Sequence, residues 1–233
     1  MSWELRLGDC LDPVAGLASI ADGSADAVVT DPPYGIADDV MDVGVRKGKR
    51  RGGDNTWHAE SEWDREIDPA WCREVCRVAP VVIWFGHWRK RAEVEAAMPY
   101  PIRAEIIWAK DVHTTPAQPV ASQDERIWVF SAAGIKPREF SPSVWPVPVI
   151  PTWAHKHHKN EKPVPLMEKL IRVFTAPGAL VVDPFAGSGT TGVAALRLGR
   201  RFLGWEKKAE HHAVALKRLS GAREQLDIFG GAA

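Results

Sequence analysis

The chain has 233 residues, of which 45% are hydrophobic and 26% are charged. This length supports one α/β domain with a full hydrophobic core, and the composition excludes a disordered, collagenous or coiled-coil protein. Lysine plus arginine and aspartate plus glutamate are equal at 30 each. A nucleic-acid-binding role therefore requires a local basic patch rather than an overall positive charge.

Apolar runs alternate with helical stretches along the chain, which is typical of parallel strands joined by crossover helices. The predicted strands are Trp3–Leu7, Ala25–Thr30, Val81–Phe85, Ile102–Trp108, Glu125–Phe130, Ala179–Val182 and Arg201–Trp205. The predicted helices are Pro13–Ala18, Ala70–Val78, Trp88–Met98, Pro163–Thr175, Thr190–Leu198 and Lys207–Leu219. Asp68 and Pro69 supply an N-cap and a first helical residue for the second of these helices. The pattern predicts an α/β fold with a mostly parallel central sheet.

Long stretches over Gly35–Ser61, Val112–Ser122 and Gly134–Asn160 are rich in residues typical of loops. Loops of this length are uncommon in a compact domain unless they bind something. No apolar run approaches the roughly 18 residues of a membrane span, and the start of the chain has no secretory pattern. The three cysteines make no even disulfide framework. We therefore expect a cytoplasmic protein with no membrane contact.

Four predicted strands are each followed by an acidic residue. These residues are Asp9, Asp31, Asp183 and Glu206. One acid at a strand end is ordinary turn chemistry or a helix cap. In an open parallel sheet, however, ligands bind beyond the carboxyl ends of the strands. If these four strands are parallel neighbours, the acids predict a polar site along one edge of the sheet.

The segment that begins at Asp183 has the pattern of a strand, a glycine-rich turn and a helix start. Gly187, Gly189 and Gly192 fit GxGxxG, and Glu206 ends the next strand, where an acid suits two ribose hydroxyls. A dinucleotide oxidoreductase, a protein binding a nucleoside cofactor without phosphates, and a tight turn with no ligand are all open interpretations. Asp183 favours the second, because its carboxylate would repel a pyrophosphate and attract the cationic end of S-adenosylmethionine.

A second motif, Asp31-Pro32-Pro33-Tyr34, follows a buried strand. The two prolines fix φ and remove two backbone donors, so the strand end is rich in acceptors. Tyr34 adds a flat ring beside the Asp31 carboxylate. This combination suits a planar substrate with an amino group, whose N–H groups are accepted while its face is stacked. Acceptors on both N–H groups would also stabilise the positive charge that develops when a nucleobase amine attacks a methyl sulfonium.

With these two motifs the chain resembles the amino-group DNA methyltransferases, with Asp31–Tyr34 as the catalytic motif and Asp183-Pro-Phe-Ala-Gly-Ser-Gly-Thr-Thr as the cofactor motif. The catalytic motif comes first, which is similar to the beta group of this family, a circular permutation of the usual order. The resemblance implies a circularly permuted, Rossmann-like, S-adenosylmethionine-dependent methyltransferase fold. It also implies a single catalytic domain over residues 1–233, with DNA-contacting loops at about 35–61 and 112–160.

The resemblance also assigns roles to residues. It implies that Asp31 and Pro32 hold the target amine, next to Pro33, and that Tyr34 stacks on the flipped base. It implies that S-adenosylmethionine is the cofactor and that the residues binding it are Asp9, Cys10, Lys162, Pro163, Asp183, Pro184, Phe185, Ala186, Gly187, Ser188, Gly189, Thr190 and Glu206. No metal site is expected.

The function that follows is site-specific methylation of double-stranded DNA, as in restriction-modification systems. An Asp at the first motif position is more typical of adenine N6 than of cytosine N4 methylation, so adenine is the favoured target. Cytosine N4 methylation remains an alternative. A nicotinamide-dependent oxidoreductase would leave the Asp-Pro-Pro-Tyr motif unexplained, and a catalytically silent DNA-binding protein would not need it.

Two basic runs are candidates for contact with DNA phosphates. They comprise Arg46, Lys47, Lys49, Arg50 and Arg51, and then His155, Lys156, His157, His158 and Lys159. The second run lies where the family carries its target-recognition region. That region is short here, and beta-group relatives are often dimers, so a homodimer is a further expectation.

Overall fold

We describe a computed structural model of the chain over residues 2–35, 67–112, 123–151 and 161–229. Within these residues the strands form one eight-stranded sheet in the order β1-β8-β7-β2-β3-β5-β4-β6. The two ends of the chain meet in this sheet, because β1 pairs with β8. The strands are β1 (Trp3–Leu7), β2 (Ala27–Thr30), β3 (Val81–Gly86), β4 (Ile102–Ala109), β5 (Asp124–Ser131), β6 (Val144–Pro146), β7 (Leu180–Asp183) and β8 (Arg201–Glu206).

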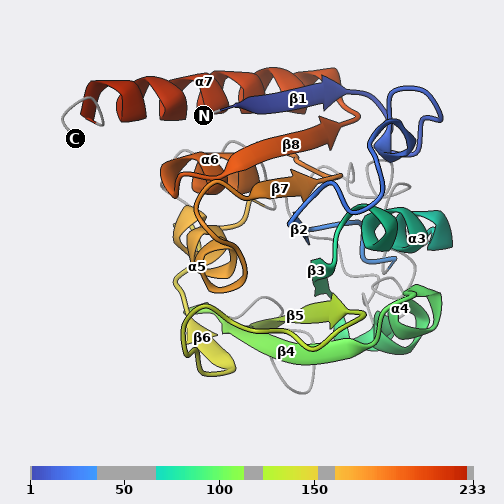
Figure 1. Ribbon diagram of the computed structural model, residues 1–233. Coiled ribbons are helices and arrows are strands. Elements are labelled where there is room, and N and C mark those ends of the chain that lie inside the picture. The colour runs from blue at the N-terminus through green and yellow to red at the C-terminus, as the bar shows by residue number, and fades with distance from the viewer. Residues whose placement is uncertain (1, 36–66, 113–122, 152–160, 230–233) are drawn as a thin grey trace, which may run out of the picture.

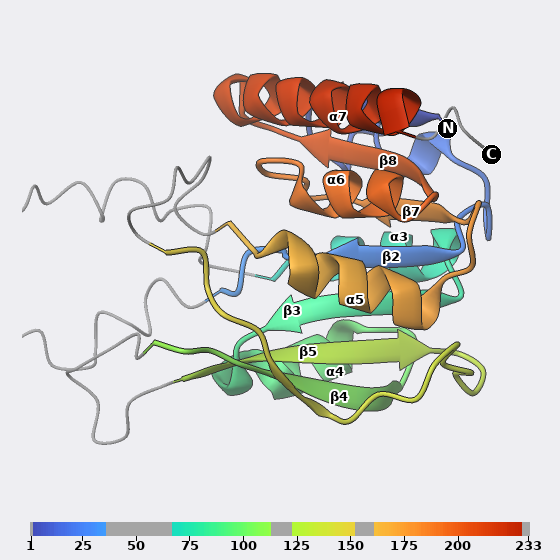
Figure 2. The same ribbon diagram turned by 90° about the vertical axis from the view of Figure 1, so that its left-hand side faces the viewer.

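The sheet is mostly parallel. Strands β1, β8, β7, β2 and β3 are parallel neighbours, whereas β5 runs antiparallel to both β3 and β4. The carboxyl ends of the parallel strands and of β4 therefore share one edge with the beginning of β5. The arrowheads of β2, β3 and β8 point to this edge, on the left of Figure 2. We call it the carboxyl edge.

Helices cover both faces of the sheet (Figures 1 and 2). Helices α5 (Val164–Phe174), α6 (Thr190–Arg197) and α7 (Ala209–Phe229) lie on one face, and α3 (Pro69–Val78) and α4 (Arg91–Ala97) lie on the other. Two short 3-10 helices, η1 (Leu17–Ser19) and η3 (Trp88–Lys90), complete the described structure. None of the helices in the described ranges is both long enough and apolar enough to cross a membrane.

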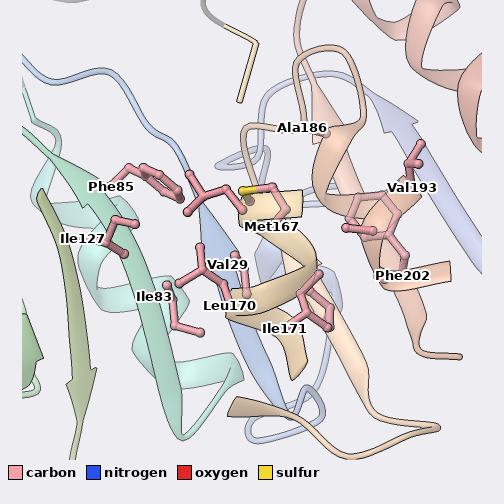
Figure 3. Close-up of a cluster of buried hydrophobic side chains, with 14 of the residues drawn as sticks. Val29, Ile83, Phe85, Ile127, Met167, Leu170, Ile171, Ala186, Val193 and Phe202 are labelled. Carbon is pink, nitrogen blue, oxygen red and sulfur yellow. The ribbon is translucent and has the colours of Figure 1, made fainter. Parts of the chain in front are cut away.

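The core consists of two apolar layers, one on each face of the sheet. Successive strand residues point to opposite faces, so Val28 and Val82 pack in the layer that contains α3, while Val29 and Ile83 pack in the layer that contains α5. Figure 3 shows Val29 and Ile83 beside Leu170 of α5. Because both faces are buried, the central strands are almost continuously apolar, as expected for a parallel sheet.

The predicted strands are confirmed, each within two residues at either end. The helix predicted over Ala70–Val78 is also confirmed, and the Asp68 carboxylate accepts the Ala70 N–H at 2.8 Å as the N-cap. The helix predicted over Lys207–Leu219 is present as α7, which begins at Ala209 and continues to Phe229. Gly221 lies inside α7. A glycine in a helix interior costs about 1 kcal/mol relative to alanine, but the helix continues past it.

The helix predicted over Pro13–Ala18 is wrong. Its only helical element is the 3-10 turn η1. The Asp12 carboxylate accepts the N–H groups of Val14 and Ala15, each at 2.8 Å, but the Leu17 N–H bonds to the Cys10 carbonyl at 2.8 Å instead of to Pro13, so an α-helix does not propagate. Strand β6 was not predicted. It has three residues, too few to show alternation.

Candidate functional site

The four acids predicted to share an edge do so. Asp9, Glu206, Asp183 and Asp31 end or follow β1, β8, β7 and β2, which are adjacent parallel strands. The Thr30 hydroxyl donates a hydrogen bond to Asp183 Oδ1 at 2.8 Å. This bond directly links the strand that leads to the Asp-Pro-Pro-Tyr turn with the strand that leads to the glycine turn. The two motifs therefore open on the same edge of the sheet.

The glycine turn connects β7 to α6 in a conformation that needs glycine. Gly187 has φ +53° and Gly189 has φ +80°, a region that residues with a Cβ rarely adopt. A Cβ on Gly189 would lie 3.0 Å from the Cβ of Ala215, whereas a Cβ on Gly187 would have no neighbour closer than 3.9 Å. The turn is thus packed against α7 at Gly189 and open at Gly187, where a ligand can approach the backbone.

Other residues of the glycine turn face the protein interior. Ser188 and Thr190 are buried, and Arg218 of α7 donates to the Ser188 carbonyl at 2.8 Å and to the Ser188 hydroxyl at 2.9 Å. Arg218 also pairs with Glu161 at 2.7 Å. The ring of Phe185 packs edge-to-face on Trp71 of α3, with 4.9 Å between centroids. The sequence contains no local signal for Arg218, whose role follows from the packing of α7 on the turn.

Asp183 is buried and accepts three hydrogen bonds. Its Oδ1 takes Thr30 and the Phe185 N–H, at 2.8 and 3.0 Å, and its Oδ2 takes the Thr191 hydroxyl at 2.6 Å. Burial raises the pKa of this carboxyl to about 6, against the lowering effect of these bonds. Asp183 therefore holds β2, the glycine turn and α6 together, and it does so at the cost of a buried charge.

This raised pKa predicts a pH-dependent effect of Asp183→Asn on stability. A carboxyl with a pKa of about 6 when folded and 3.8 when unfolded stabilises the fold below pH 3.8, and this contribution is lost as the pH rises through 6. The loss is about 3 kcal/mol. Asparagine resembles the protonated acid, so the variant should gain stability relative to the natural protein between pH 4 and pH 7. Urea unfolding at both pH values measures the change, with Asp22→Asn on the surface as the control. An equal difference at both pH values would contradict the prediction.

At the other two strands of the edge, the acids contact backbone groups and lysines. Glu206 Oε2 accepts the Gly187 N–H at 2.9 Å, which places this acid against the open part of the glycine turn. Asp9 accepts the Leu11 N–H and the Lys207 ammonium, both at 2.9 Å. Cys10 is buried, and burial raises the pKa of its thiol to about 12, so it stays protonated near neutral pH.

In the Asp-Pro-Pro-Tyr turn, Asp31 is held on both carboxylate oxygens. The Tyr34 hydroxyl donates to Oδ1 at 2.6 Å, and the Lys162 ammonium donates to Oδ2 at 2.7 Å. Lys162 also lies 3.1 Å from the Tyr34 hydroxyl oxygen. It comes from the segment before α5, directly ahead of Pro163, which is the N-cap of that helix. Lys162, expected to contact the cofactor, thus contacts the carboxylate of the catalytic motif.

Two charged residues that the sequence analysis missed complete this part of the edge. Glu125 Oε2 lies 3.2 Å from Lys162 Nζ, and Glu125 Oε1 lies 2.6 Å from Lys110 Nζ. Lys110 directly follows β4, and Glu125 is the second residue of β5. Glu125 does not fit the pattern of an acid at the end of a strand. Because β5 is antiparallel to its neighbours, its beginning lies at the carboxyl edge instead.

The charged groups of this cluster shift one another's pKa values. Burial raises the pKa of Asp31, and Lys162 opposes this effect. Burial also acts to raise the pKa of Glu125, but the attraction of Lys162 and Lys110 outweighs it and the pKa is lowered. Burial acts to lower the pKa of Lys162, and the two carboxylates outweigh it, so this pKa is raised. Lys162 and Glu125 therefore carry their charges near neutral pH.

The predicted DNA-contacting residues of the two basic runs, 46–51 and 155–159, lie outside the described residues. At the carboxyl end of β3, however, Trp88 is 60% exposed, with the guanidinium carbon of Arg89 5.2 Å from the centroid of its ring. An exposed aromatic ring beside a cation is a feature of surfaces that bind nucleic acid.

An α/β sheet with these two turns on neighbouring parallel strands has the architecture of the S-adenosylmethionine-dependent DNA methyltransferases. Among solved structures, M1.HpyAVI in complex with SAM matches with a TM-score of 0.67 at 21% identity, covering 93% of this chain and 100% of that chain. PvuII DNA methyltransferase, which is cytosine-N4-specific, matches with a TM-score of 0.65 at 19% identity, covering 97% and 93%.

Sequence comparison defines the family. The N6/N4 model of the DNA methylase family matches residues 25–217. The YubD protein of Escherichia coli (strain K12) is 33% identical over 229 residues, which cover 94% of this chain and 91% of YubD. The chain belongs to the N6/N4 DNA methylase family. It is a DNA amino-methyltransferase, and the oxidoreductase interpretation of the glycine turn is set aside.

Proposed function

We propose that this DNA methylase uses S-adenosylmethionine to methylate the N6 amine of adenine in double-stranded DNA. The observation that carries the proposal is the hydrogen bond from Thr30 to Asp183, because it places the turn suited to an amine next to the turn suited to a nucleoside cofactor. The Asp in the first position of the catalytic motif supports adenine over cytosine. The meeting of β1 and β8 in one sheet supports a single catalytic domain.

The residues at the glycine turn fit S-adenosylmethionine. The open backbone at Gly187 allows close approach, Glu206 lies beside it for the ribose hydroxyls, and the turn carries no lysine that would suit a triphosphate. When bound, this cofactor supplies an electrophilic methyl group. We propose that the cofactor-binding residues are those named from the resemblance, with Asp9 and Glu206 at its nucleoside end.

The Asp-Pro-Pro-Tyr turn would receive a base that has been flipped out of the duplex, because the target amine is inaccessible inside it. The Asp31 carboxylate accepts an amine N–H and stabilises the positive charge that develops on the nitrogen. The ring of Tyr34 stacks on the base. Both Asp31 oxygens already accept hydrogen bonds, Oδ1 from Tyr34 and Oδ2 from Lys162. The incoming amine would therefore displace the Tyr34 hydroxyl from Oδ1 or donate to Oδ1 alongside it.

The target base is identified by product analysis. The purified protein is incubated with labelled S-adenosylmethionine and unmethylated genomic DNA, and the DNA is digested to nucleosides and separated. Label in N6-methyl-2′-deoxyadenosine is expected, and label in N4-methyl-2′-deoxycytidine would overturn the adenine assignment. If no nucleoside is labelled and Asp31→Ala behaves like the natural protein, the methyltransferase proposal fails.

For DNA contact, we propose the basic run of Arg46, Lys47, Lys49, Arg50 and Arg51. Replacing them with glutamine should reduce the slope of log affinity against log salt by about 0.9 for each lost phosphate contact. Fluorescence anisotropy with a labelled duplex at several salt concentrations measures the slope. The exposed Lys136 and Arg138, which follow β5 at the opposite edge of the sheet, are the matched control when replaced in the same way. An unchanged slope in the first variant would refute this contact.

Homodimer formation stays a prediction from the resemblance.

A further inference from the structure

We propose that Glu125 and Lys110 are positioning residues that act on Asp31 through Lys162, and that they set the lower end of the pH range for methyl transfer. The inference rests on the proposed function, because Asp31 affects the reaction only if it holds the target amine. Neither residue belongs to the two motifs, and neither contacts Asp31 directly in the bonds described above.

The geometry is a chain of alternating charges, Asp31–Lys162–Glu125–Lys110. The distances along it are 2.7 Å, 3.2 Å and 2.6 Å. The side chains are 9–25% exposed, so solvent screens these pairs less than it screens surface pairs. With two carboxylates and two ammonium groups, the formal charge of the cluster is zero.

Lys162 is shared between the carboxylates of Asp31 and Glu125. A lysine paired with Asp31 alone would neutralise the negative charge that the target amine needs. Because Lys162 also pairs with Glu125, it compensates the negative charge of Asp31 only in part. Lys110 pairs with Glu125 and partly compensates the charge of that carboxylate. Lys162 is further confined by the rings of Tyr34 and Phe85, whose centroids lie 5.5 and 5.1 Å from its Nζ.

Within the described residues, Tyr34 and Asp183 also face this cluster. The Tyr34 hydroxyl lies 2.6 Å from Asp31 Oδ1 and 3.3 Å from Glu125 Oε2. Asp183 of β7 is close enough for its charge and that of Asp31 to repel. Tyr34 stays neutral, because burial and the two carboxylates raise its pKa. The carboxyls of this region whose pKa is raised are Asp31 and Asp183.

Removing Glu125 or Lys110 should shift the reaction in opposite directions. In Glu125→Gln, Lys162 pairs with Asp31 alone, and the loss of a neighbouring negative charge lowers the pKa of Asp31. In Lys110→Met, the cluster has one excess negative charge, so its carboxylates bind a proton at a higher pH. The acid limb of the rate profile should move down by about one pH unit in the first variant and up by about one in the second.

The experiment measures single-turnover methyl transfer between pH 5 and pH 9, with S-adenosylmethionine and DNA both saturating. Glu125→Gln should also lower the plateau rate about tenfold, because the charge of Asp31 is neutralised more fully. Glu125→Asp keeps the charge and should restore the position of the acid limb. Glu105→Gln, the same change on neighbouring β4, is the matched control and should keep the natural profile.

The double variant distinguishes action through Glu125 from an independent effect. If Lys110 acts only through Glu125, adding Lys110→Met to Glu125→Gln should produce no further shift. Additive shifts, or an acid limb that moves in neither single variant, would overturn the inference while leaving the proposed function intact. An inactive natural protein would count against the proposed function instead. Thermal unfolding is recorded for each variant, and the Glu125→Asp comparison tests the inference if Lys110→Met fails to fold.

Discussion

Replacing Asp31 with asparagine should lower the single-turnover rate of methyl transfer about 100- to 1,000-fold. Asparagine keeps the shape of the side chain and one oxygen acceptor but removes the negative charge beside the developing positive charge on the amine. It also directs either an amide NH2 group or the weaker amide oxygen at Lys162, where the natural carboxylate accepts at 2.7 Å. The rate is measured with saturating labelled S-adenosylmethionine and unmethylated DNA.

A control separates loss of chemistry from loss of cofactor binding in this variant. Asp31→Asn should bind S-adenosylmethionine by calorimetry within about threefold of the natural protein, because Asp31 bonds to Tyr34 and Lys162 rather than to the glycine turn. Asp22→Asn, an isosteric change at a side chain that is 79% exposed, should leave both quantities unchanged. A rate for Asp31→Asn within tenfold of the natural rate would contradict the assigned role.

Replacing Lys162 with methionine should destabilise the fold by about 3 kcal/mol at pH 7. Lys162 is 10% exposed and separates two carboxylates. Without it, Asp31 and Glu125 face each other with only Lys110 as a counter-charge, and the pKa of the pair rises. The destabilisation should therefore shrink as the pH falls through the raised pKa, because a shared proton replaces the lost ammonium.

Urea unfolding between pH 5 and pH 8 measures this dependence. Lys136→Met, at an exposed lysine, is the matched control and should change the free energy of unfolding by less than about 0.5 kcal/mol. The opposite result, a destabilisation that grows on acidification, would show that the two carboxylates do not depend on Lys162 for their charge compensation.

Much of the architecture was predictable because its determinants are local. A central strand buried on both faces is an apolar run, and an N-cap such as Asp68 acts within one helical turn. The helix predicted over Pro13–Ala18 does not form because the Leu17 N–H bonds to the Cys10 carbonyl instead of continuing the helical ladder. The Asp-Pro-Pro-Tyr motif and the glycine-rich motif are each short, continuous stretches of sequence, so both could be identified from residue order alone.

Nothing in the local pattern of β5 indicates that its first residues lie beside Asp31. That position depends on β5 running antiparallel to β3, which brings Glu125 to the carboxyl edge. Lys110 and Lys162 reach the same edge from other segments of the chain.

Residue order alone thus specified the strands other than β6, most of the helices and the two motifs, because each depends on neighbours in the chain. The charge cluster around Asp31 came only from the folded chain, because strand direction and partner are set by long-range packing, and those contacts decide which charged groups meet.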